Sequence, residues 1–297
     1  MHVIALFGPT GVGKTAVAIA LAERLRERGE RPLAVSADAI QVYRGLETLS
    51  GAATAEERAR LEHRLLSFAD PRESFSAGEF AARAHAEIDS ALAAGRRPIV
   101  VGGTGLYLQA ALTDLDLRPP PPPGLRERLT RELEARGPEA LHAELAGRAA
   151  EAAAAIDPRD RTRIVRALEL LEMGEEPLRT GLWTARVRHP TVLAGLTMER
   201  EALYERIDVR VDAMVAAGAA EEARRAEAAG AGPTARAALG FEELLRGDVD
   251  AMKRRTRNYA KRQLTWMRRL PDVHEIDVTG RDGDWAARSI LHILAAS

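Results

Sequence analysis

The sequence predicts an α/β fold: a parallel sheet flanked by helices, with an inserted all-helical domain. Three observations support this prediction. Short apolar runs rich in β-branched residues alternate with amphipathic stretches, a pattern typical of a parallel sheet covered on both faces. Between residues 124 and 174 the pattern changes to several short helices with no strand among them. Aromatic residues make up only 4% of the 297 residues and alanine is abundant, which favours helix.

The first half of the chain predicts three strands and two helices. Residues 3–7 form an apolar run typical of a buried strand, and the helix that follows a glycine-rich loop closes at Gly29. A second strand is expected at residues 33–36. The capping-box pattern at residues 76–79 predicts the start of a long helix, and the apolar run at residues 99–101 predicts a third strand.

Five consecutive prolines at residues 119–123 mark the predicted domain boundary, because proline can neither continue a helix nor sit inside a sheet. Strand periodicity returns at residues 191–196 and near residues 275–278. We therefore expect a body that is split in sequence, with residues 1–117 as its first part, residues 118–190 as the helical insert, and residues 191–297 as its remainder.

Composition excludes several classes of protein. The chain contains no cysteine, so disulfide frameworks, thiolate zinc sites and cysteine nucleophiles are all excluded. No apolar run has the length needed to span a bilayer, and the amino terminus enters a strand without a signal-peptide pattern. We therefore expect a cytoplasmic protein with no membrane partner.

A phosphate-binding loop connects the first strand to the first helix. Its residues fit the pattern G-x-x-x-x-G-K-[ST] in the strand–loop–helix context that the motif requires, and the body is thus expected to resemble P-loop NTPases. Backbone N–H groups of such a loop surround a phosphate, its lysine adds a charge, and its threonine hydroxyl can bind Mg²⁺. The loop comprises Gly8, Pro9, Thr10, Gly11, Val12, Gly13, Lys14 and Thr15, of which Thr15 is the candidate metal ligand.

The loop predicts a phosphorylated ligand but does not decide the reaction, since kinases, ATPases and GTPases share it. The strand at residues 99–101 runs into Gly-Gly-Thr104 with no acidic residue. Because an acidic residue usually ends the corresponding strand of an ATPase and helps to hold Mg²⁺, its absence disfavours an ATPase.

Asp38 follows the second strand directly, at the end of the sheet where open α/β folds bind their ligands. A carboxylate at this position could orient Mg²⁺ or accept a proton. The alternative is that Asp38 caps the amino terminus of the next helix.

With these motifs in place, the chain resembles the tRNA dimethylallyltransferase family, also called tRNA isopentenyltransferases. The resemblance runs almost from end to end. Its most specific parts are Val101-Gly-Gly-Thr-Gly-Leu-Tyr107 and Thr256-Arg-Asn-Tyr-Ala-Lys-Arg-Gln-Leu-Thr-Trp266. It also rests on the phosphate-binding loop, Ser36-Ala-Asp-Ala-Ile-Gln-Val-Tyr43, His63-Arg-Leu-Leu66, Ser76-Ala-Gly-Glu-Phe80, Arg163-Ile-Val-Arg-Ala-Leu-Glu169 and Tyr204-Glu-Arg-Ile-Asp-Val-Arg210.

The resemblance implies transfer of a dimethylallyl group from dimethylallyl diphosphate to N6 of a flipped-out adenine at position 37, next to the anticodon of a tRNA. It implies that the loop and Arg210 bind diphosphate, with Mg²⁺ as cofactor. Asp38 would be the general base, and Thr104 would contact the acceptor or the reacting diphosphate. Partners would be the tRNA anticodon stem-loop and the prenyl donor, and we expect a monomer. The implied tRNA contacts are Asp38, Ala39, Ile40, Gln41, Thr162, Arg163, Ile164, Val165 and Arg166.

The sequence departs from the family at two places. Where the family usually has Gly-Thr-Ala-Lys-Pro, this chain has Leu49-Ser-Gly-Ala-Ala53, and the lysine is missing. Three residues before the glycine of Leu239-Gly-Phe241 the family often has a polar or basic residue, and this chain has Ala237. No role is assigned to either segment.

Residues 253–269 carry eight basic residues and no acidic one, although the formal net charge of the whole chain is only −1. As one helix, this segment would have an apolar side formed by Met252, Tyr259, Leu264, Met267 and Leu270. Arg254, Arg257 and Lys261 would form a basic stripe suited to a nucleic-acid backbone, and Arg255, Arg262 and Arg269 would form another. The alternative is a solvated surface, but such surfaces usually mix signs.

Three other functions stay open at this point. A small-molecule kinase would explain the phosphate-binding loop but not the basic helix. A non-catalytic RNA-binding module would not need the intact Lys14, Thr15 and Asp38. A relative that prenylates free adenine nucleotides would need neither the helical insert nor the basic helix.

Overall fold

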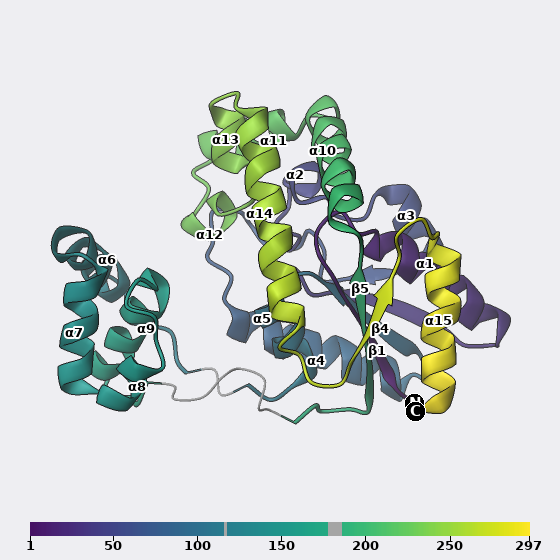
Figure 1. Ribbon diagram of the computed structural model, residues 1–297, viewed down its shortest axis with the longest axis horizontal. Helices are drawn as coiled ribbons and strands as arrows, with labels where there is room; N and C mark the ends of the chain where they lie inside the picture. Colours follow the sequence, from purple (N-terminus) through teal and green to yellow (C-terminus); the bar gives the residue numbers. More distant parts are fainter. Residues whose placement is uncertain (116–117, 178–185) are drawn as a thin grey trace. The chain divides into compact units, whose positions relative to one another are not determined.

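The computed structural model describes residues 1–115, 118–177 and 186–297, and these form two compact units (Figure 1). The α/β unit comprises Met1–Leu115 and Ala185–Ser297, and the helical unit comprises Asp116–Thr184. The helical unit ends earlier than the expected residue 190, because the chain before the fifth strand already bonds to the α/β unit. The Arg188 N–H donates to the Leu112 carbonyl (2.8 Å), and the Val3 N–H donates to the Pro190 carbonyl (2.9 Å).

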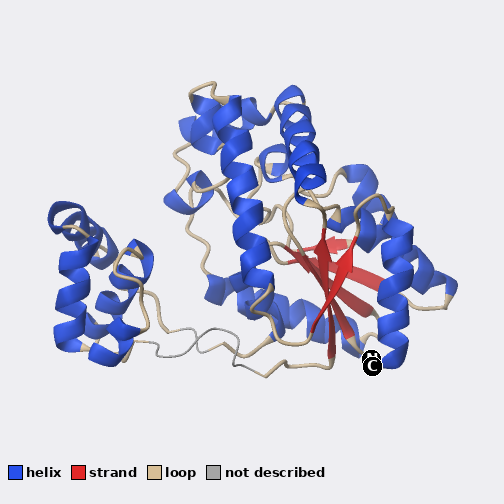
Figure 2. Ribbon diagram, in the orientation of Figure 1, coloured by secondary structure: helices blue, strands red, loops and turns tan. Residues whose placement is uncertain are grey.

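The α/β unit is built on a six-stranded parallel sheet in the order β3-β2-β4-β1-β5-β6. Helices lie on both faces of this sheet (Figure 2). This confirms the α/β fold class. The strands are β1 (Val3–Phe7), β2 (Pro32–Ser36), β3 (His63–Arg64), β4 (Arg97–Gly102), β5 (Thr191–Thr197) and β6 (Val273–Asp277).

In the middle of the sheet, β1 is wholly apolar and β2 is apolar except for Ser36 at its end. Every residue of β1 and β2 is buried, and β1 lies between β4 and β5, with Ile4 opposite both Ile99 and Val192. Burial on both faces explains why the sequences of these strands are continuous apolar runs rather than alternating apolar and polar residues. The edge strand β6 is mostly exposed and begins two residues before its expected start.

The faces of the sheet are covered by α1 (Lys14–Glu27) with α15 (Gly283–Ala296), and by α4 (Ala77–Ala93) with α5 (Gly105–Leu112). The capping box that predicted the start of α4 is present. The Ser76 hydroxyl accepts from the Glu79 N–H (3.2 Å), and the Glu79 carboxylate accepts from the Ser76 N–H (2.9 Å). Several elements of the α/β unit lie outside the prediction, among them the two-residue strand β3, helix α5 and the terminal helix α15.

The described part of the α/β unit has seven further helices, and two of them, α10 and α14, run alongside each other (Figure 1). Helix α3 packs beside α1, and most of the others lie at the end of the sheet at which the phosphate-binding loop emerges. The seven are α2 (Glu47–Ser50), α3 (Ala55–Arg60), α10 (Arg200–Ala216), α11 (Ala219–Ala228), α12 (Pro233–Arg236), α13 (Phe241–Leu245) and α14 (Val249–Met267).

The helical unit consists of α6 (Leu125–Arg136), α7 (Pro138–Arg148), α8 (Ala150–Ala154) and α9 (Arg161–Glu172). Its core is formed mainly by leucines, among them Leu129, Leu141 and Leu168. Glu169 is fully buried beside this core, and its carboxylate accepts hydrogen bonds from Arg126 (2.6 Å) and Arg166 (2.9 Å). A buried carboxylate that is paired in this way avoids most of the cost of burying a lone charge.

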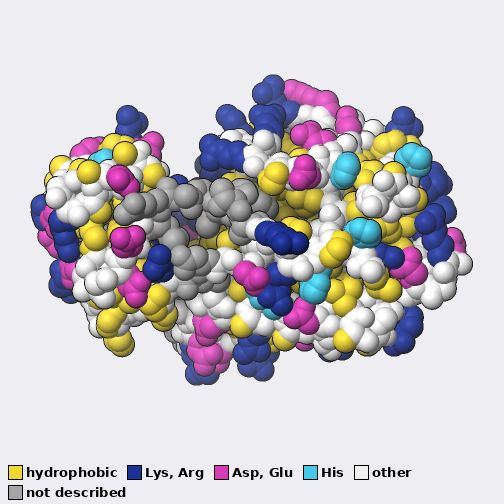
Figure 3. Space-filling model, turned by 90° about the horizontal axis from the view of Figure 1, so that it is seen from below, with side chains coloured by type: hydrophobic (Ala, Val, Ile, Leu, Met, Phe, Trp, Pro, Cys, Tyr) yellow, Lys and Arg dark blue, Asp and Glu magenta, His cyan; other side chains and the backbone are white. Residues whose placement is uncertain are grey.

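Charges of both signs are interspersed on the surface. On the face shown in Figure 3, the basic and acidic side chains lie among one another, in line with the formal net charge of −1. Among the described residues, no helix combines the length and the apolar character that crossing a membrane requires.

Candidate active site

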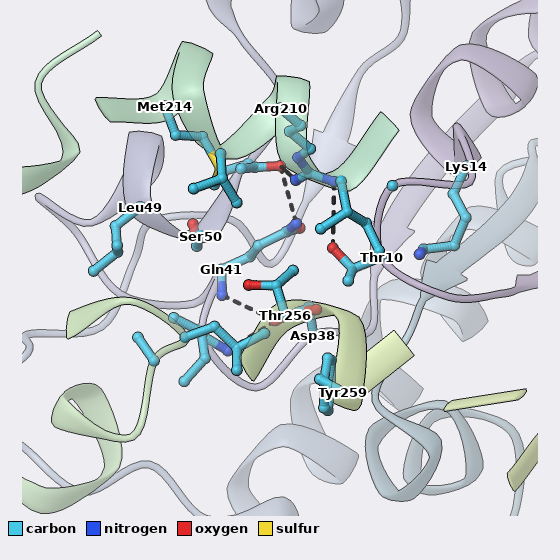
Figure 4. A pocket seen from close by; sticks show the side chains of 18 of the residues that line it. Thr10, Lys14, Asp38, Gln41, Leu49, Ser50, Arg210, Met214, Thr256 and Tyr259 are labelled. Carbon is cyan, nitrogen blue, oxygen red and sulfur yellow. Dashed lines mark hydrogen bonds between the residues drawn. The ribbon is translucent and has the colours of Figure 1, made fainter. Parts of the chain in front are cut away.

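A cavity of about 940 Å³ lies in the α/β unit at the carboxyl end of the sheet (Figure 4). One part of its wall is polar and comes from the phosphate-binding loop, residues 38–41 and Thr104. Another part is more apolar, with Leu49, Met214 and Met252 among its side chains. The cavity can therefore hold a ligand that has both a charged and a hydrocarbon part.

The phosphate-binding loop has the backbone that its sequence predicts. Gly11 and Gly13 have φ of +84° and +101°, which glycine adopts at little cost. The loop leads directly into α1 at Lys14, so that the positive end of this helix faces the cavity. Thr10 and Thr15 also line the cavity, whereas Gly8, Pro9 and Val12 shape the loop behind it.

Lys14 lies within the loop, and its Nζ donates to the carbonyls of Gly8 and Pro9 (both 2.9 Å). The pKa of Lys14 is lowered to about 7, mainly by burial and in addition by the nearby positive charge of Arg210, whereas Asp38 opposes both effects. A lysine in this setting gains most from a bound anion, because the anion would stabilise its charged form.

Asp38 lies in a turn and does not cap a helix. Its Oδ1 accepts from the N–H groups of Ile40 (2.9 Å) and Gln41 (3.4 Å), and the next helix, α2, begins only at Glu47. Asp38 Oδ2 accepts no hydrogen bond from the residues that the structure describes, and the side chain lines the cavity. This geometry leaves one carboxylate oxygen available to a ligand.

Arg210 reaches from α10 to the loop. Its Nη1 donates to the Thr10 hydroxyl and its Nη2 donates to the Gly51 carbonyl (both 3.4 Å). Burial lowers the pKa of Arg210, and Asp38 and Glu57 oppose that change. The structure thus brings together the loop, Asp38 and Arg210, which are separated by up to two hundred residues in the chain.

Thr104 is the residue before α5, and its hydroxyl lies 3.4 Å from the hydroxyl of Tyr259 on α14. Burial raises the pKa of Tyr259 to about 12, with a further contribution from Asp38. The phenol therefore stays protonated near neutral pH and can act as a hydrogen-bond donor. Sequence reasoning placed Tyr259 on the apolar side of its helix and missed this position.

Gln263 joins α14 to the phosphate-binding loop, and sequence reasoning missed it as well. Its Oε1 accepts from the Thr10 N–H (2.8 Å), and its Nε2 donates to the Gly103 carbonyl (2.7 Å). The side chain is only 4% exposed. A glutamine among basic residues is predicted to be exposed, and only the tertiary structure shows that it is buried.

A model of the family described as IPP transferase matches residues 41–270 of the chain. The chain belongs to this family. It is 43% identical over 283 residues to the tRNA dimethylallyltransferase of Thermobifida fusca, with 92% of this chain and 88% of the relative covered. It is 42% identical over 307 residues to the tRNA dimethylallyltransferase of Streptomyces coelicolor, with 100% and 95% covered.

Solved structures of the IPP transferase family share the fold. A tRNA isopentenylpyrophosphate transferase from Bacillus halodurans matches with a TM-score of 0.72 and 36% identity, covering 99% of this chain and 96% of the other. A eukaryotic dimethylallyltransferase acting on tRNA matches with a TM-score of 0.77 and 26% identity, covering 94% and 74%. These findings confirm the family resemblance that the motifs predicted.

The basic helix α14 divides its charges differently from the prediction. Arg254 and Lys261 are exposed, whereas Arg257 donates to the Asp208 carboxylate (2.6 Å) and lies over the Tyr204 ring. The other expected stripe contributes Arg255 and Arg262 to the cavity wall. Arg257 is therefore already paired within the protein, because α10 presents an acidic residue that the sequence of α14 alone does not reveal.

Met252 and Met267 on the expected apolar side of α14 are buried, as is Leu270 just after the helix. The buried side differs from the expectation at two positions, because Tyr259 and Leu264 are only partly buried, whereas Thr256 and Gln263 are buried. The difference arises because this side of the helix contacts a polar loop as well as a hydrophobic core. The buried residues of α14 are Met252, Thr256, Ala260, Gln263 and Met267.

The segment of the helical unit that the resemblance assigned to tRNA also contains both exposed and buried residues. Thr162 and Arg163 are exposed, but Ile164 and Val165 belong to the hydrophobic core of the unit. Arg166 pairs with the buried Glu169 and donates to the backbone carbonyls of residues 118 and 119. The side chains of Ile164 and Val165 thus pack inside the helical unit, and contact of this segment with tRNA stays a prediction.

Both segments that depart from the family sequence lie at the site. Residues 49–52 and Ala237 line the cavity. The neighbouring Arg236 faces two carboxylates and donates to Glu242 (2.7 Å) and to Glu227. The departures therefore affect the wall of the site rather than a distant surface.

Proposed function

We propose that this protein is a tRNA dimethylallyltransferase, which transfers a dimethylallyl group from dimethylallyl diphosphate to N6 of the adenine next to the anticodon. The observation that carries the proposal is the shared cavity. A phosphate-binding loop and Arg210 face an available carboxylate, Asp38, across a space that also has apolar walls. The curated relatives of the same family bear the name of this activity.

The diphosphate of the donor is assigned to the loop. Its leaving oxygen gains negative charge as the bond to the prenyl carbon breaks, and fixed donors that face this charge lower the barrier. Lys14, Arg210 and the amino terminus of α1 supply these donors. The hydrocarbon part fits the apolar side chains of Leu49 and Met214, which lie on one side of Arg210 in Figure 4.

The acceptor adenine is assigned to the Asp38 side of the cavity. The N6 lone pair is delocalised into the ring, so the amine attacks well only if a base takes its proton as the new N–C bond forms. Asp38 has a carboxylate oxygen free for this role, and Thr104 and Tyr259 lie at the same wall. The adenine must leave its stack to reach the cavity.

Mg²⁺ is the proposed cofactor, and the residues present fit a P-loop type of site. No cluster of three or more acidic or histidine side chains that could hold a metal occurs among the described residues. Mg²⁺ in phosphate sites takes few protein ligands, and most of its ligands are phosphate and water oxygens. Thr15 lines the cavity and would supply the hydroxyl ligand, and the ion would add positive charge beside the leaving diphosphate.

The macromolecular partner is proposed to be the anticodon stem-loop of a tRNA. Residues 38–41 at the cavity, the exposed Thr162 and Arg163, and the exposed Arg254 and Lys261 on α14 are the surface positions assigned to it. We propose that the enzyme acts as a monomer in the cytoplasm, where its acceptor tRNA is found.

Label transfer tests the proposal. Dimethylallyl diphosphate that is radioactive in its prenyl group is incubated with unmodified tRNA and Mg²⁺, and parallel reactions contain either a free adenine nucleotide or γ-labelled ATP. We expect label on tRNA only. Label on the free nucleotide would restrict the acceptor to small molecules. Phosphate transfer from ATP to a small molecule, without prenyl transfer, would instead identify a kinase.

A further inference from the structure

Helix α10 packs against the phosphate-binding loop and carries two arginines to it. Arg206 and Arg210 both line the cavity, and side chains four residues apart lie on the same side of a helix. Ile207 holds the helix close to the loop, because a Cβ atom at Gly11 would lie only 2.8 Å from its side chain. Two cations on one helix are thus presented to one loop.

The two arginines reach different parts of the loop. Arg210 Nη1 donates to the Thr10 hydroxyl (3.4 Å) in the first half of the loop (Figure 4). Arg206 Nη2 lies beside Gly13 in the second half, where a Cβ atom on that glycine would be 3.2 Å from it. Gly13 directly precedes Lys14, the first residue of α1. The Arg206 guanidinium therefore lies near the positive end of α1, where such a loop binds phosphate.

Arg206 has no anionic partner of its own. Its side chain is exposed, and its guanidinium forms no ion pair or hydrogen bond with the residues that the structure describes. Two further arginines of the cavity wall are engaged: Arg255 donates to Glu243 (3.0 Å), and Arg262 lies over an aromatic ring of α14. A cation that lies unpaired beside a helix amino terminus gains most from a bound phosphate.

We propose that Arg206 is a second diphosphate-binding arginine, which holds the terminal phosphate of the prenyl donor while Arg210 holds the phosphate that carries the prenyl group. Asp38 decides which arginine takes which phosphate. Its charge raises the pKa of Arg210, so these two groups are neighbours, and Asp38 is the proposed base on the side where transfer occurs. The inference rests on the proposed function, because it takes a prenyl diphosphate as the ligand.

The two positions have different consequences for the reaction. As the bond to the prenyl carbon breaks, negative charge develops on the oxygen of the phosphate that carried the prenyl group. Arg210 therefore interacts more strongly with the transition state than with the bound donor. Arg206 binds the terminal phosphate about equally in both, and such uniform binding lowers KM without raising kcat.

The test compares Arg206→Ala with the matched control Arg200→Ala. Arg200 lies on the same helix and is also exposed, but it pairs with the adjacent Glu201 (3.4 Å) and is not among the described residues that line the cavity. Both substitutions remove one exposed positive charge from α10, so a general effect of charge would be equal in both. Calorimetric titration with inorganic diphosphate and Mg²⁺ measures the site, and thermal unfolding shows that the variants are folded.

We expect Arg206→Ala to weaken diphosphate binding about tenfold, the loss that corresponds to one charge-assisted hydrogen bond, and Arg200→Ala to leave it unchanged. Arg206→Lys should recover part of the affinity, because lysine keeps the charge but lacks the forked geometry of the guanidinium. In turnover assays, Arg206→Ala should raise the KM for dimethylallyl diphosphate and leave kcat nearly unchanged, whereas Arg210→Ala should lower kcat as well.

Unchanged affinity in Arg206→Ala, or an equal loss in Arg200→Ala, would overturn the inference. A fall in kcat as large as that of Arg210→Ala, at unchanged KM, would contradict the assignment of Arg206 to the terminal phosphate. Failure of the wild-type protein to bind diphosphate would overturn the inference too. Binding that follows the expected pattern in a protein that transfers no prenyl group would instead refute only the proposed function, because the titration needs no prenyl donor.

Discussion

Asp38 carries the acid–base part of the account at the scale of single residues. The substitution Asp38→Asn should keep the turn, because an amide oxygen can accept from the N–H groups of Ile40 and Gln41 as the carboxylate does. An amide cannot take the N6 proton, so we expect transfer to fall by about a hundredfold or more. Diphosphate binding, measured by calorimetry, should persist. Near-normal turnover of this variant would remove Asp38 from the role of general base.

Lys14 gives a prediction on pH. Its pKa is lowered to about 7, mainly by burial, and the unfolded value is about 10.4. Between these values the folded protein binds fewer protons than the unfolded chain, so Lys14 makes stability rise with pH across this window and adds no further change above it. Charging Lys14 in the folded protein is therefore unfavourable unless an anion compensates.

A bound diphosphate would stabilise the charged lysine and raise its pKa. At pH 8 we therefore expect the protein to take up a proton at Lys14 when it binds diphosphate. Calorimetric titrations in buffers of different ionisation enthalpy measure this uptake. Lys14→Arg is the control. Because arginine stays charged throughout, this variant should lack the part of the proton uptake that is due to Lys14. Equal proton uptake by the wild-type protein and Lys14→Arg would contradict the lowered pKa.

At the scale of elements, α14 combines two roles that its sequence suggested only in part. The basic composition of residues 253–269 predicted a helix with charged stripes, and the helix is present. Which arginine within the first stripe is paired depends on α10, because its Asp208 accepts from Arg257. The polar contact of Gln263 with the phosphate-binding loop depends on a loop two hundred and fifty-three residues away. Such partners lie outside any local pattern.

The division of charges on α14 can be tested through salt dependence. Each exposed cation that contacts a phosphate contributes about one unit to the slope of log K against log salt concentration. We expect Arg254→Ala and Lys261→Ala each to weaken tRNA binding and reduce this slope by about one. Arg257→Ala should leave the slope nearly unchanged, because its charge already faces Asp208. An equal slope change in all three variants would show that pairing with Asp208 does not matter.

Other elements show where local patterns suffice. The strands of the buried sheet, the glycine-rich loop and the capping box at Ser76 are determined by short-range patterns, and the structure confirms them. The strand β3 has only two residues, too few for a periodicity to appear.

At the scale of the whole molecule, the chain leaves the α/β unit and returns to it at adjacent points. Thr113 and Val187 form an antiparallel bridge, and the Arg188 N–H donates to the Leu112 carbonyl (2.8 Å). The helical unit has its own hydrophobic core between these points. The two parts of the α/β unit are thus joined by their own contacts, and this arrangement is typical of an inserted domain.

Replacement of residues 116–184 by a short glycine-rich linker should therefore leave a folded α/β unit. We expect this variant to bind inorganic diphosphate with nearly normal affinity, since every residue of the cavity wall lies outside the deletion. Prenyl transfer to tRNA should fall strongly, because the assigned contacts at Thr162 and Arg163 are removed. Normal transfer would exclude the helical unit from tRNA recognition.

The most direct test of the central claim is to map the product. Unmodified tRNA is treated with the enzyme, dimethylallyl diphosphate and Mg²⁺, digested with nucleases and analysed by mass spectrometry, with Asp38→Asn in parallel. The account predicts a gain of one C5H8 unit on the adenine next to the anticodon, strongly reduced in Asp38→Asn. A modification at another nucleotide, or none with the wild-type protein, would contradict the assignment of this cavity to tRNA prenylation.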